Sequence, residues 1–276
     1  MRLTSSSMKR MVLTIIVLVF LLLAYSLIEP YFVQVNEVEF VSPHLPREFD
    51  GVRIVFASDI HCGQFFSTGR LKELVGLIDS LKPDMVLLGG DYVLGGAGYI
   101  PECVRELKSL HAPLGVFAVL GNHDNWAGAE LTKSSLEDAG ITVLDNKAMW
   151  VTQGGARIKV GGVGDLWTES QNISPTIGDT KEGDFIILMS HNPAYADEVK
   201  DLDIGLIVSG HTHGGQILPV TLLAPHLPSR LRQKYVAGVF DVGGSRLIVT
   251  KGVGMVFVPV RFLVRPEVVV ITLRMG

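Results

Sequence analysis

The chain has 276 residues, of which 47% are hydrophobic and 19% are charged, and its formal net charge is −4 at pH 7. No block of basic residues stands out, so we expect no surface dedicated to nucleic acid. The two cysteines, Cys62 and Cys103, allow at most one disulfide and exclude the framework of a small disulfide-rich domain. The length beyond an N-terminal apolar segment suits one large domain or two small ones.

The N-terminus has the features of a membrane anchor. Residues 1–10 are a basic N-terminus, and residues 11–28 then run without a charge. A helix of that length rises about 27 Å, which is just enough for a thin bilayer core. We predict an uncleaved, single-pass transmembrane signal anchor in the inner, cytoplasmic membrane. The alternatives are a cleaved signal, with a candidate site at residues 24–26, and an apolar anchor that does not cross.

The charges that flank the apolar segment predict its orientation. Arg2, Lys9 and Arg10 precede it, and Glu29 follows it. By the positive-inside rule the N-terminus stays in the cytoplasm and the main domain lies outside. Only three positive charges support this orientation, so a domain on the cytoplasmic side stays open.

Beyond the anchor, residues 29–51 read as a linker with a lead-in edge strand, and residues 52–276 as the main domain. Short apolar runs predict strands over residues 52–57, 85–88, 116–120, 141–144, 149–152, 157–163, 185–189, 204–208, 235–240, 246–250 and 268–273. Apolar residues at helical spacing predict helices within residues 71–78, 103–110, 131–139 and 194–201. Because strands and helices alternate in the first half, we predict an α/β fold with a parallel sheet covered by helices.

Polar side chains that can bind metals follow the five main apolar runs, at the point where each run ends. They are Asp59, His61, Asp91, Asn122, His123, His191, His211 and His213. Taken singly, each is more ordinary: a helix cap, a turn residue or a surface histidine. Ligands of open α/β sheets bind beyond the carboxyl ends of the strands, so this set predicts one shared site. Its mixture of oxygen and imidazole donors suits two ions of Mn, Fe or Zn rather than Ca. We interpret Cys62 as a packing residue, not a ligand.

The same positions carry a resemblance to a known family. The blocks Asp59-x-His61, Gly90-Asp91, Gly121-Asn122-His123-Asp124, His191 and Gly210-His211-x-His213 resemble the calcineurin-like metallophosphoesterase superfamily. Further stretches, among them residues 87–93, 162–167 and 210–216, are similar to its bacterial membrane-associated branch of the YkuE, YaeI and LpxG type. That branch includes phosphodiesterases and a UDP-2,3-diacylglucosamine pyrophosphatase of lipid A synthesis. Leu94 and Gly95 stand where serine/threonine phosphatases carry Asp and Arg, which argues against a phosphoprotein phosphatase.

The resemblance implies a four-layer α/β/β/α sandwich of two mixed sheets, preceded by one transmembrane helix. It also implies two divalent metal ions, for which we favour Mn over Fe or Zn. One ion would be held by Asp59, His61, Asp91 and His213, and the other by Asp91, Asn122, His191 and His211. A hydroxide between the ions would cleave a phosphodiester or pyrophosphate bond.

His123 would then protonate the leaving oxygen or stabilise the transition state. The resemblance leaves open what orients this histidine; Asp124 is a candidate, and a structural role for Asp124 is the alternative.

The substrate is predicted from the apolar segments near the last two histidines. Residues 217–236 are apolar and broken by prolines, and they end in Arg230, Arg232 and Lys234. Together with residues 255–263 they would form a lip that meets the bilayer, with the basic residues binding the substrate. The alternative is a loop that covers the core and ends in solvated charges.

We therefore expect the membrane and a phosphoester or nucleotide-diphospho-lipid as partners. The specific expectation is hydrolysis of UDP-2,3-diacylglucosamine to lipid X (2,3-diacylglucosamine 1-phosphate) and UMP. That substrate is cytoplasmic, whereas the charges around the anchor place the domain outside. A broad-specificity envelope phosphodiesterase or phosphatase is the alternative, and a metal-binding module without turnover is a third reading.

Overall fold

The computed structural model describes residues 5–223 and 233–276 of the chain. Its longer helices are α1 (Ser5–Ile28), α2 (Thr68–Ser80), α3 (Ile100–Leu107), α4 (Asn122–Asp138), α5 (Ser174–Ile177) and α6 (Leu218–Leu223). Its strands are β1 (Gln34–Ser42), β2 (Arg53–Ala57), β3 (Met85–Leu88), β4 (Val116–Ala118), β5 (Thr142–Val143), β6 (Lys147–Gln153), β7 (Ala156–Gly162), β8 (Ile186–Met189), β9 (Leu206–Ser209), β10 (Gly238–Val242), β11 (Ser245–Val249) and β12 (Glu267–Met275).

The strands form two six-stranded mixed sheets. The first has the order β1-β12-β2-β3-β4-β5, and the second has the order β10-β11-β9-β8-β7-β6. In the first sheet β2, β3, β4 and β5 are parallel, and β12 runs antiparallel to β2. In the second sheet β11, β9, β8 and β7 are parallel, while β10 and β6 are antiparallel edges.

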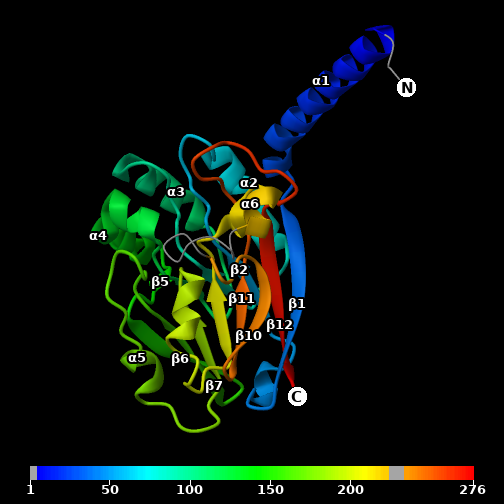
Figure 1. The fold of residues 1–276 in the computed structure, drawn as a ribbon. Coiled ribbons are helices and arrows are strands. Elements are labelled where there is room, and N and C mark those ends of the chain that lie inside the picture. The colour runs from blue at the N-terminus through cyan, green and yellow to red at the C-terminus, as the bar shows by residue number, and fades with distance from the viewer. Residues whose placement is uncertain (1–4, 224–232) are drawn as a thin grey trace.

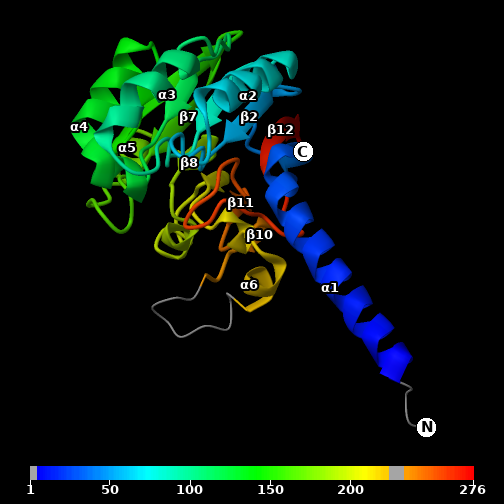
Figure 2. The same cartoon turned by 90° about the horizontal axis from the view of Figure 1, so that it is seen from above.

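The two sheets pack face to face on a shared apolar core. Phe56 and Leu87 of the first sheet belong to the same buried cluster as Ile187 and Val208 of the second. The opposite face of the first sheet packs on α2, α3 and α4, which lie together on one side of the body (Figure 2). The outer face of the second sheet is covered by α5 and by a 3-10 helix, Pro193–Asp197. The expected four-layer α/β/β/α sandwich of two mixed sheets is therefore confirmed.

Several local predictions differ from the structure for physical reasons. The parallel sheet expected in the first half is present as β2 to β5, and β12, from the far end of the chain, joins β2 in the antiparallel direction. The helix expected within residues 194–201 is the short 3-10 helix, which begins at Pro193. Helix α4 begins at Asn122, nine residues before Leu131, where the helical spacing of apolar residues begins in the sequence. The helix kinks at Gly128. The expected lead-in strand is β1, which pairs with β12 along its full length.

Helix α1 projects away from the body, while its last turn packs on it (Figure 1). The side chains from Met8 to Leu22 are exposed. Ser26 and Glu29 are buried, and the Ser26 carbonyl accepts a hydrogen bond from the Arg261 amide at 3.0 Å. Within the described residues, the helix spanning Ser7–Tyr31 is long and apolar enough to cross a membrane, with a mean hydropathy of 2.9.

Candidate metal centre

The predicted ligand residues all lie at one edge of the sandwich, where parallel strands of both sheets end. Asp59 follows β2, Asp91 follows β3, and Asn122 opens α4 after β4. His191 follows β8, and the histidine pair follows β9. The two sheets are joined here directly, because the amide of His211 donates to Asp59 Oδ1 at 2.9 Å. The structure thus brings together side chains that are up to 154 residues apart, from Asp59 to His213.

A first cluster contains Asp59, His61, His213 and Asp91. The Nε2 atoms of His61 and His213 face each other at 3.0 Å. Asp59 Oδ1 lies 3.6 Å from His213 Nε2, and Asp91 Oδ2 lies 3.5 Å from His61 Nε2. All four residues are buried. Four metal-binding atoms therefore converge on one point.

A second cluster contains Asp91, Asn122, His191 and His211. His211 Nδ1 lies 3.0 Å from Asn122 Oδ1 and 3.3 Å from His191 Nε2. His191 Nε2 in turn lies 3.3 Å from Asp91 Oδ2. The Oδ2 atom of Asp91 is thus close to both clusters and stands between them.

Backbone contacts of neighbouring residues hold Asp91 in this central position. Its Oδ1 atom accepts a hydrogen bond from the His123 amide at 2.9 Å. Its own amide donates to Asp124 Oδ2 at 2.7 Å, and the carboxylate of Asp124 also accepts from the amides of Tyr92 and Gly121. Asp124 therefore joins the turn after β3 to the start of α4. Within the described part of the chain its carboxylate bonds backbone amides and not the His123 ring, which favours its structural role.

The ligand candidates share an unusual backbone conformation. Asp59, His61, Asp91, His211 and His213 all have positive φ, between 51° and 70°. Each such non-glycine residue costs about 1–3 kcal/mol and persists only where the surroundings impose it. Clustering of this strain is typical of functional sites. Holding these five side chains in place therefore costs the protein folding stability.

Burial and charge set the ionisation of the histidines. Burial lowers the pKa of His61 to about 4, and burial together with the charge of His191 lowers the pKa of His211 to about 3. Burial also acts to lower the pKa of His191, but the carboxylate of Asp91 outweighs it and raises the pKa to about 10. Neutral His61 and His211 keep lone pairs for a metal, and positive charge is stabilised beside Asp91.

These residues fit the two divalent metals that the sequence predicts. The Nδ1 atoms of His61 and His213 are buried and have no hydrogen-bond partner among the described residues. Facing Nε2 atoms with two adjacent carboxylates form a donor set that a cation satisfies. His191 Nδ1 lies 2.8 Å from the carbonyl of Gly89, so Nδ1 carries a proton, and Nε2 is the ring nitrogen that faces the second cluster and would bind a metal in place of its own proton.

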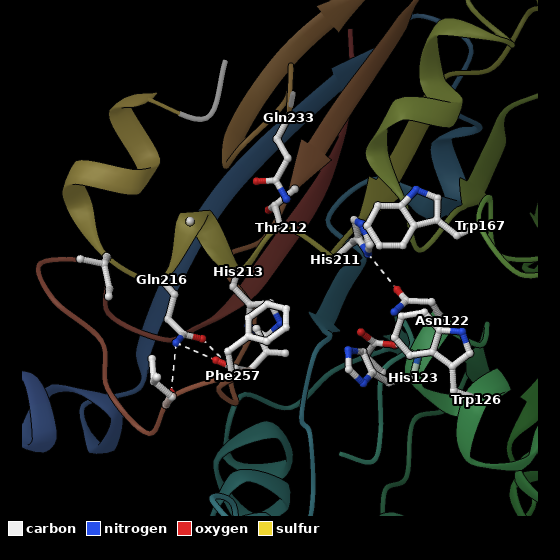
Figure 3. A pocket seen from close by; sticks show the side chains of 15 residues that line it. Asn122, His123, Trp126, Trp167, His211, Thr212, His213, Gln216, Gln233 and Phe257 are labelled. Carbon is white, nitrogen blue, oxygen red and sulfur yellow. Dashed lines mark hydrogen bonds between the residues drawn. The ribbon is translucent and has the colours of Figure 1, made fainter. Parts of the chain in front are cut away.

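A cavity of about 380 Å³ opens onto the second cluster and contains His123. The ring of His123 lies edge-on to His61 and to Trp126, each at 4.8 Å between ring centroids. Trp167 lies 4.2 Å from the ring of His211. Figure 3 shows both tryptophans on one side of the cavity and Phe257 on the other, with His211 and His123 between them.

The cavity walls include two tryptophans that the sequence did not single out, together with Phe257 from the apolar segment 255–263. Trp126, Trp167 and Phe257 are 62%, 61% and 88% exposed, although they are large and aromatic. The side chain of Gln216 fixes the backbone on either side of Phe257. Its Nε2 donates to the carbonyls of Val256 and Val258, and its Oε1 accepts from the Val256 amide. Trp167 is the last residue of the stretch 162–167, which resembles the family, but the sequence analysis gave this tryptophan no role.

Of the three predicted basic substrate contacts, the structure describes only Lys234. Lys234 Nζ pairs with Asp197 Oδ1 at 2.6 Å and is exposed, and Lys234 does not line the cavity. Arg230 and Arg232 lie outside the described residues. Their role toward a substrate stays a prediction.

Comparison with known proteins identifies relatives of the whole chain. The family profile described as calcineurin-like phosphoesterase matches residues 52–215. The uncharacterized metallophosphoesterase YkuE of Bacillus subtilis (strain 168) is 31% identical over 251 residues, which cover 90% of this chain and 87% of that protein. An uncharacterized metallophosphoesterase of Aquifex aeolicus (strain VF5) is 32% identical over 265 residues, covering 92% and 97%. Phosphodiesterase YaeI of Escherichia coli (strain K12) is 32% identical over 225 residues, covering 80% and 82%.

Proposed function

The chain belongs to the calcineurin-like phosphoesterase family, and on this premise we propose that it is a membrane-anchored, two-metal hydrolase of phosphodiester or pyrophosphate bonds. The observation that carries the proposal is the pair of donor clusters that share Asp91 Oδ2. One shared carboxylate between two sets of donors is the arrangement that a two-metal hydrolase needs. We further propose residues 11–28 as the anchor and residues 52–276 as the catalytic domain, with β1 as its edge strand.

The proposed ligands divide between two ions. Asp59, His61, Asp91 and His213 would hold the first, and Asp91, Asn122, His191 and His211 the second. Mn is favoured, with Fe or Zn as alternatives, because carboxylate, amide and imidazole donors are combined. When bound, the ions supply Lewis-acid stabilisation of phosphoryl charge and lower the pKa of the attacking water.

His123 is the proposed proton donor to the leaving oxygen. Its amide is tied to Asp91, so the backbone places its ring at a fixed position beside the first cluster. Its ring lines the cavity, where a substrate oxygen can reach it. Burial lowers its pKa, so the proton it donates is weakly held.

The proposed substrate is a lipid-linked nucleotide diphosphate, specifically UDP-2,3-diacylglucosamine, cleaved to lipid X and UMP. The exposed indoles of Trp126 and Trp167 support this choice, because flat apolar rings suit a nucleobase or an acylated sugar. A broad-specificity envelope phosphodiesterase is the second candidate, favoured by the E. coli relative named as a phosphodiesterase.

The first experiment tests the two-metal mechanism. The full chain, purified with Mn²⁺, is expected to hydrolyse bis-p-nitrophenyl phosphate. Asp91→Asn should lower the rate by more than about a hundredfold, because it removes the carboxylate common to both clusters. Asp241→Asn, at an exposed carboxylate on β10, is the matched control and should keep the wild-type rate. Full activity of Asp91→Asn would refute the mechanism.

A second experiment separates the two candidate substrates. UDP-2,3-diacylglucosamine presented in mixed micelles should release UMP faster than bis-p-nitrophenyl phosphate releases nitrophenol. Cleavage of simple esters alone would reject the lipid substrate and leave the broad-specificity enzyme. A reporter fused to the C-terminus determines the side of the membrane, and a cytoplasmic result would agree with the lipid A reaction.

A further inference from the structure

A second cavity, of about 330 Å³, lies where α1 meets the body. Its walls are Val19, Leu22, Leu23 and Ser26 of α1, together with Ile217, Val260 and Phe262. All of these side chains are apolar except that of Ser26, and the Ser26 hydroxyl donates within the helix to the Leu23 carbonyl at 2.7 Å. The proton of that hydroxyl is therefore already used, and the rest of the side-chain lining is apolar.

The helix contributes one continuous face to this cavity. Val19, Leu22, Leu23 and Ser26 have the i, i+3, i+4, i+7 spacing that places side chains on one side of a helix. All four lie inside the segment that is apolar enough to cross a membrane. If α1 spans the bilayer, the cavity opens at the level where lipid chains begin.

The junction between α1 and the body is fixed by specific contacts. The amide of Leu263 donates to Oε2 of the buried Glu29 at 2.6 Å, and the Arg261 amide bonds the Ser26 carbonyl. The rings of Tyr25 and Phe262 meet edge-on at 6.2 Å. Figure 1 shows the orange-red segment before β12 beside the base of α1 and α6. The helix wall of the cavity is therefore held in place.

The second cavity adjoins the catalytic one. Ile217 lines both cavities, and Gln216, the residue before it, lines the catalytic cavity. Phe262, on the far side, is hydrogen-bonded through its backbone to Gln216 and Leu218. The catalytic cavity, which reaches the metal centre, and the apolar cavity thus share Ile217 as a wall residue.

We propose that this second cavity is an acyl-chain subsite, which binds an alkyl chain of the substrate whose phosphoester lies at the metal centre. The inference rests on the proposed function and on the proposed membrane anchor. A phosphate, sugar or peptide would find only the Ser26 hydroxyl there, whereas an alkyl chain gains free energy with each methylene that it buries. The anchor then has two roles: it holds the enzyme at the membrane, and it forms one wall of the substrate site.

The test uses two chromogenic phosphodiesters that differ only in chain length. They are p-nitrophenyl methyl phosphate and p-nitrophenyl dodecyl phosphate, assayed with the full chain in phosphatidylcholine nanodiscs and Mn²⁺. The measured quantity is the ratio of kcat/KM for the dodecyl ester to kcat/KM for the methyl ester. The wild type is expected to prefer the dodecyl ester.

Two substitutions fill the cavity from opposite walls, and one control leaves it open. Leu22→Trp fills it from the helix and Val260→Trp from the body. Each should lower the dodecyl-to-methyl ratio by about tenfold while leaving the methyl ester unaffected, because a few methylenes lose their burial. Leu21→Trp places the same ring on the opposite, exposed face of α1 and should keep the wild-type ratio.

The outcomes separate this inference from the proposed function. A wild-type ratio in both cavity variants, or an equal fall in Leu21→Trp, would overturn the acyl-chain subsite while leaving the hydrolase intact. Equal losses on both esters in both cavity variants would leave the ratio at its wild-type value and overturn the subsite in the same way, because the preference for the long chain would not depend on the cavity. If the wild type cleaves neither ester, the proposed function fails and the subsite fails with it.

Discussion

At the scale of single residues, buried groups that are not themselves ligand candidates determine the geometry of the metal centre. Asp124 is fully buried, and both of its carboxylate oxygens accept backbone amides from the turn after β3. It acts on the site through Asp91, whose amide it binds. A polar side chain in this position is therefore a positioning residue.

We expect Asp124→Asn to destabilise the fold by about 1–3 kcal/mol, because the new amide nitrogen leaves buried amides without an acceptor. It should also weaken Mn²⁺ binding. Chemical unfolding and calorimetric titration measure the two effects. Asp138→Asn, at an exposed carboxylate in the last turn of the same helix, is the matched control. Wild-type values for both quantities in Asp124→Asn would contradict the positioning role.

A glycine decides how closely the two sheets approach at the site. A methyl group on Gly210 would overlap the side chains of Ser58 and Asp59. Gly210→Ala should therefore displace Asp59 and weaken Mn²⁺ affinity by about tenfold or more. Gly96→Ala, where nothing lies within 4 Å of the added carbon, serves as the control in the same titration. Equal affinities for the two variants would show that Asp59 is not displaced.

At the scale of elements, the segment between β11 and β12 connects the anchor to the catalytic cavity. Arg261 is 0% exposed, and its guanidinium donates to the carbonyls of Lys251, Gly252, Gly254 and Val264. The Arg261 side chain thus holds several turns of this segment together. The segment contributes Phe257 to the catalytic cavity, and its Phe262 ring contacts Tyr25 of α1. No periodicity in the sequence reveals such a residue, because its partners are backbone atoms.

Arg261→Lys should cost about 3 kcal/mol of unfolding free energy, because an ammonium group cannot reach carbonyls on several sides and leaves some of them unpaired. Chemical unfolding of the detergent-solubilised chain measures the change. Arg246→Lys, at a half-exposed arginine of β11, should stay within about 0.5 kcal/mol of wild type. A similarly small change for Arg261→Lys would show that this segment folds without the guanidinium.

At the scale of the whole molecule, α1 is the element that exposes a large apolar surface. From Met11 to Leu23 its side chains are exposed and, apart from Thr14, apolar. The membrane proposed above would supply apolar surroundings for them. The direction in which α1 leaves the body then sets which face of the catalytic domain approaches the bilayer (Figure 2).

Replacing both Ile15 and Leu18 with arginine should release the protein from membranes, because each central charge costs about 2.5–3.5 kcal/mol of insertion free energy. Alkaline carbonate extraction followed by immunoblotting measures the released fraction. Met8→Arg, near the start of the helix, should remain in the membrane pellet. Retention of the double variant would mean that another surface holds the protein there.

The sequence was most informative where chemistry is local. Apolar runs gave the central strands to within one or two residues, as for residues 85–88 and β3, and the polar residues after them marked the edge where the site lies. It was less informative about helix starts: α4 begins with the polar residues Asn122 and His123, whose helical state is imposed by contacts with Asp91 and Asp124. It gave no indication of Arg261 or of the second cavity.

The sequence by itself determined the fold class, the ligand types and the presence of an apolar N-terminal helix, since periodicity, side-chain chemistry and hydropathy are properties of neighbouring residues. The family resemblance implied how the donors divide around Asp91. Only the tertiary structure decided how closely these donors approach one another, and that the exposed Trp126, Trp167 and Phe257 line the cavity beside them. It also decided that α1 packs beside Ile217. These are contacts between segments far apart in the chain, and they depend on how two sheets and a helix pack, which no local pattern records.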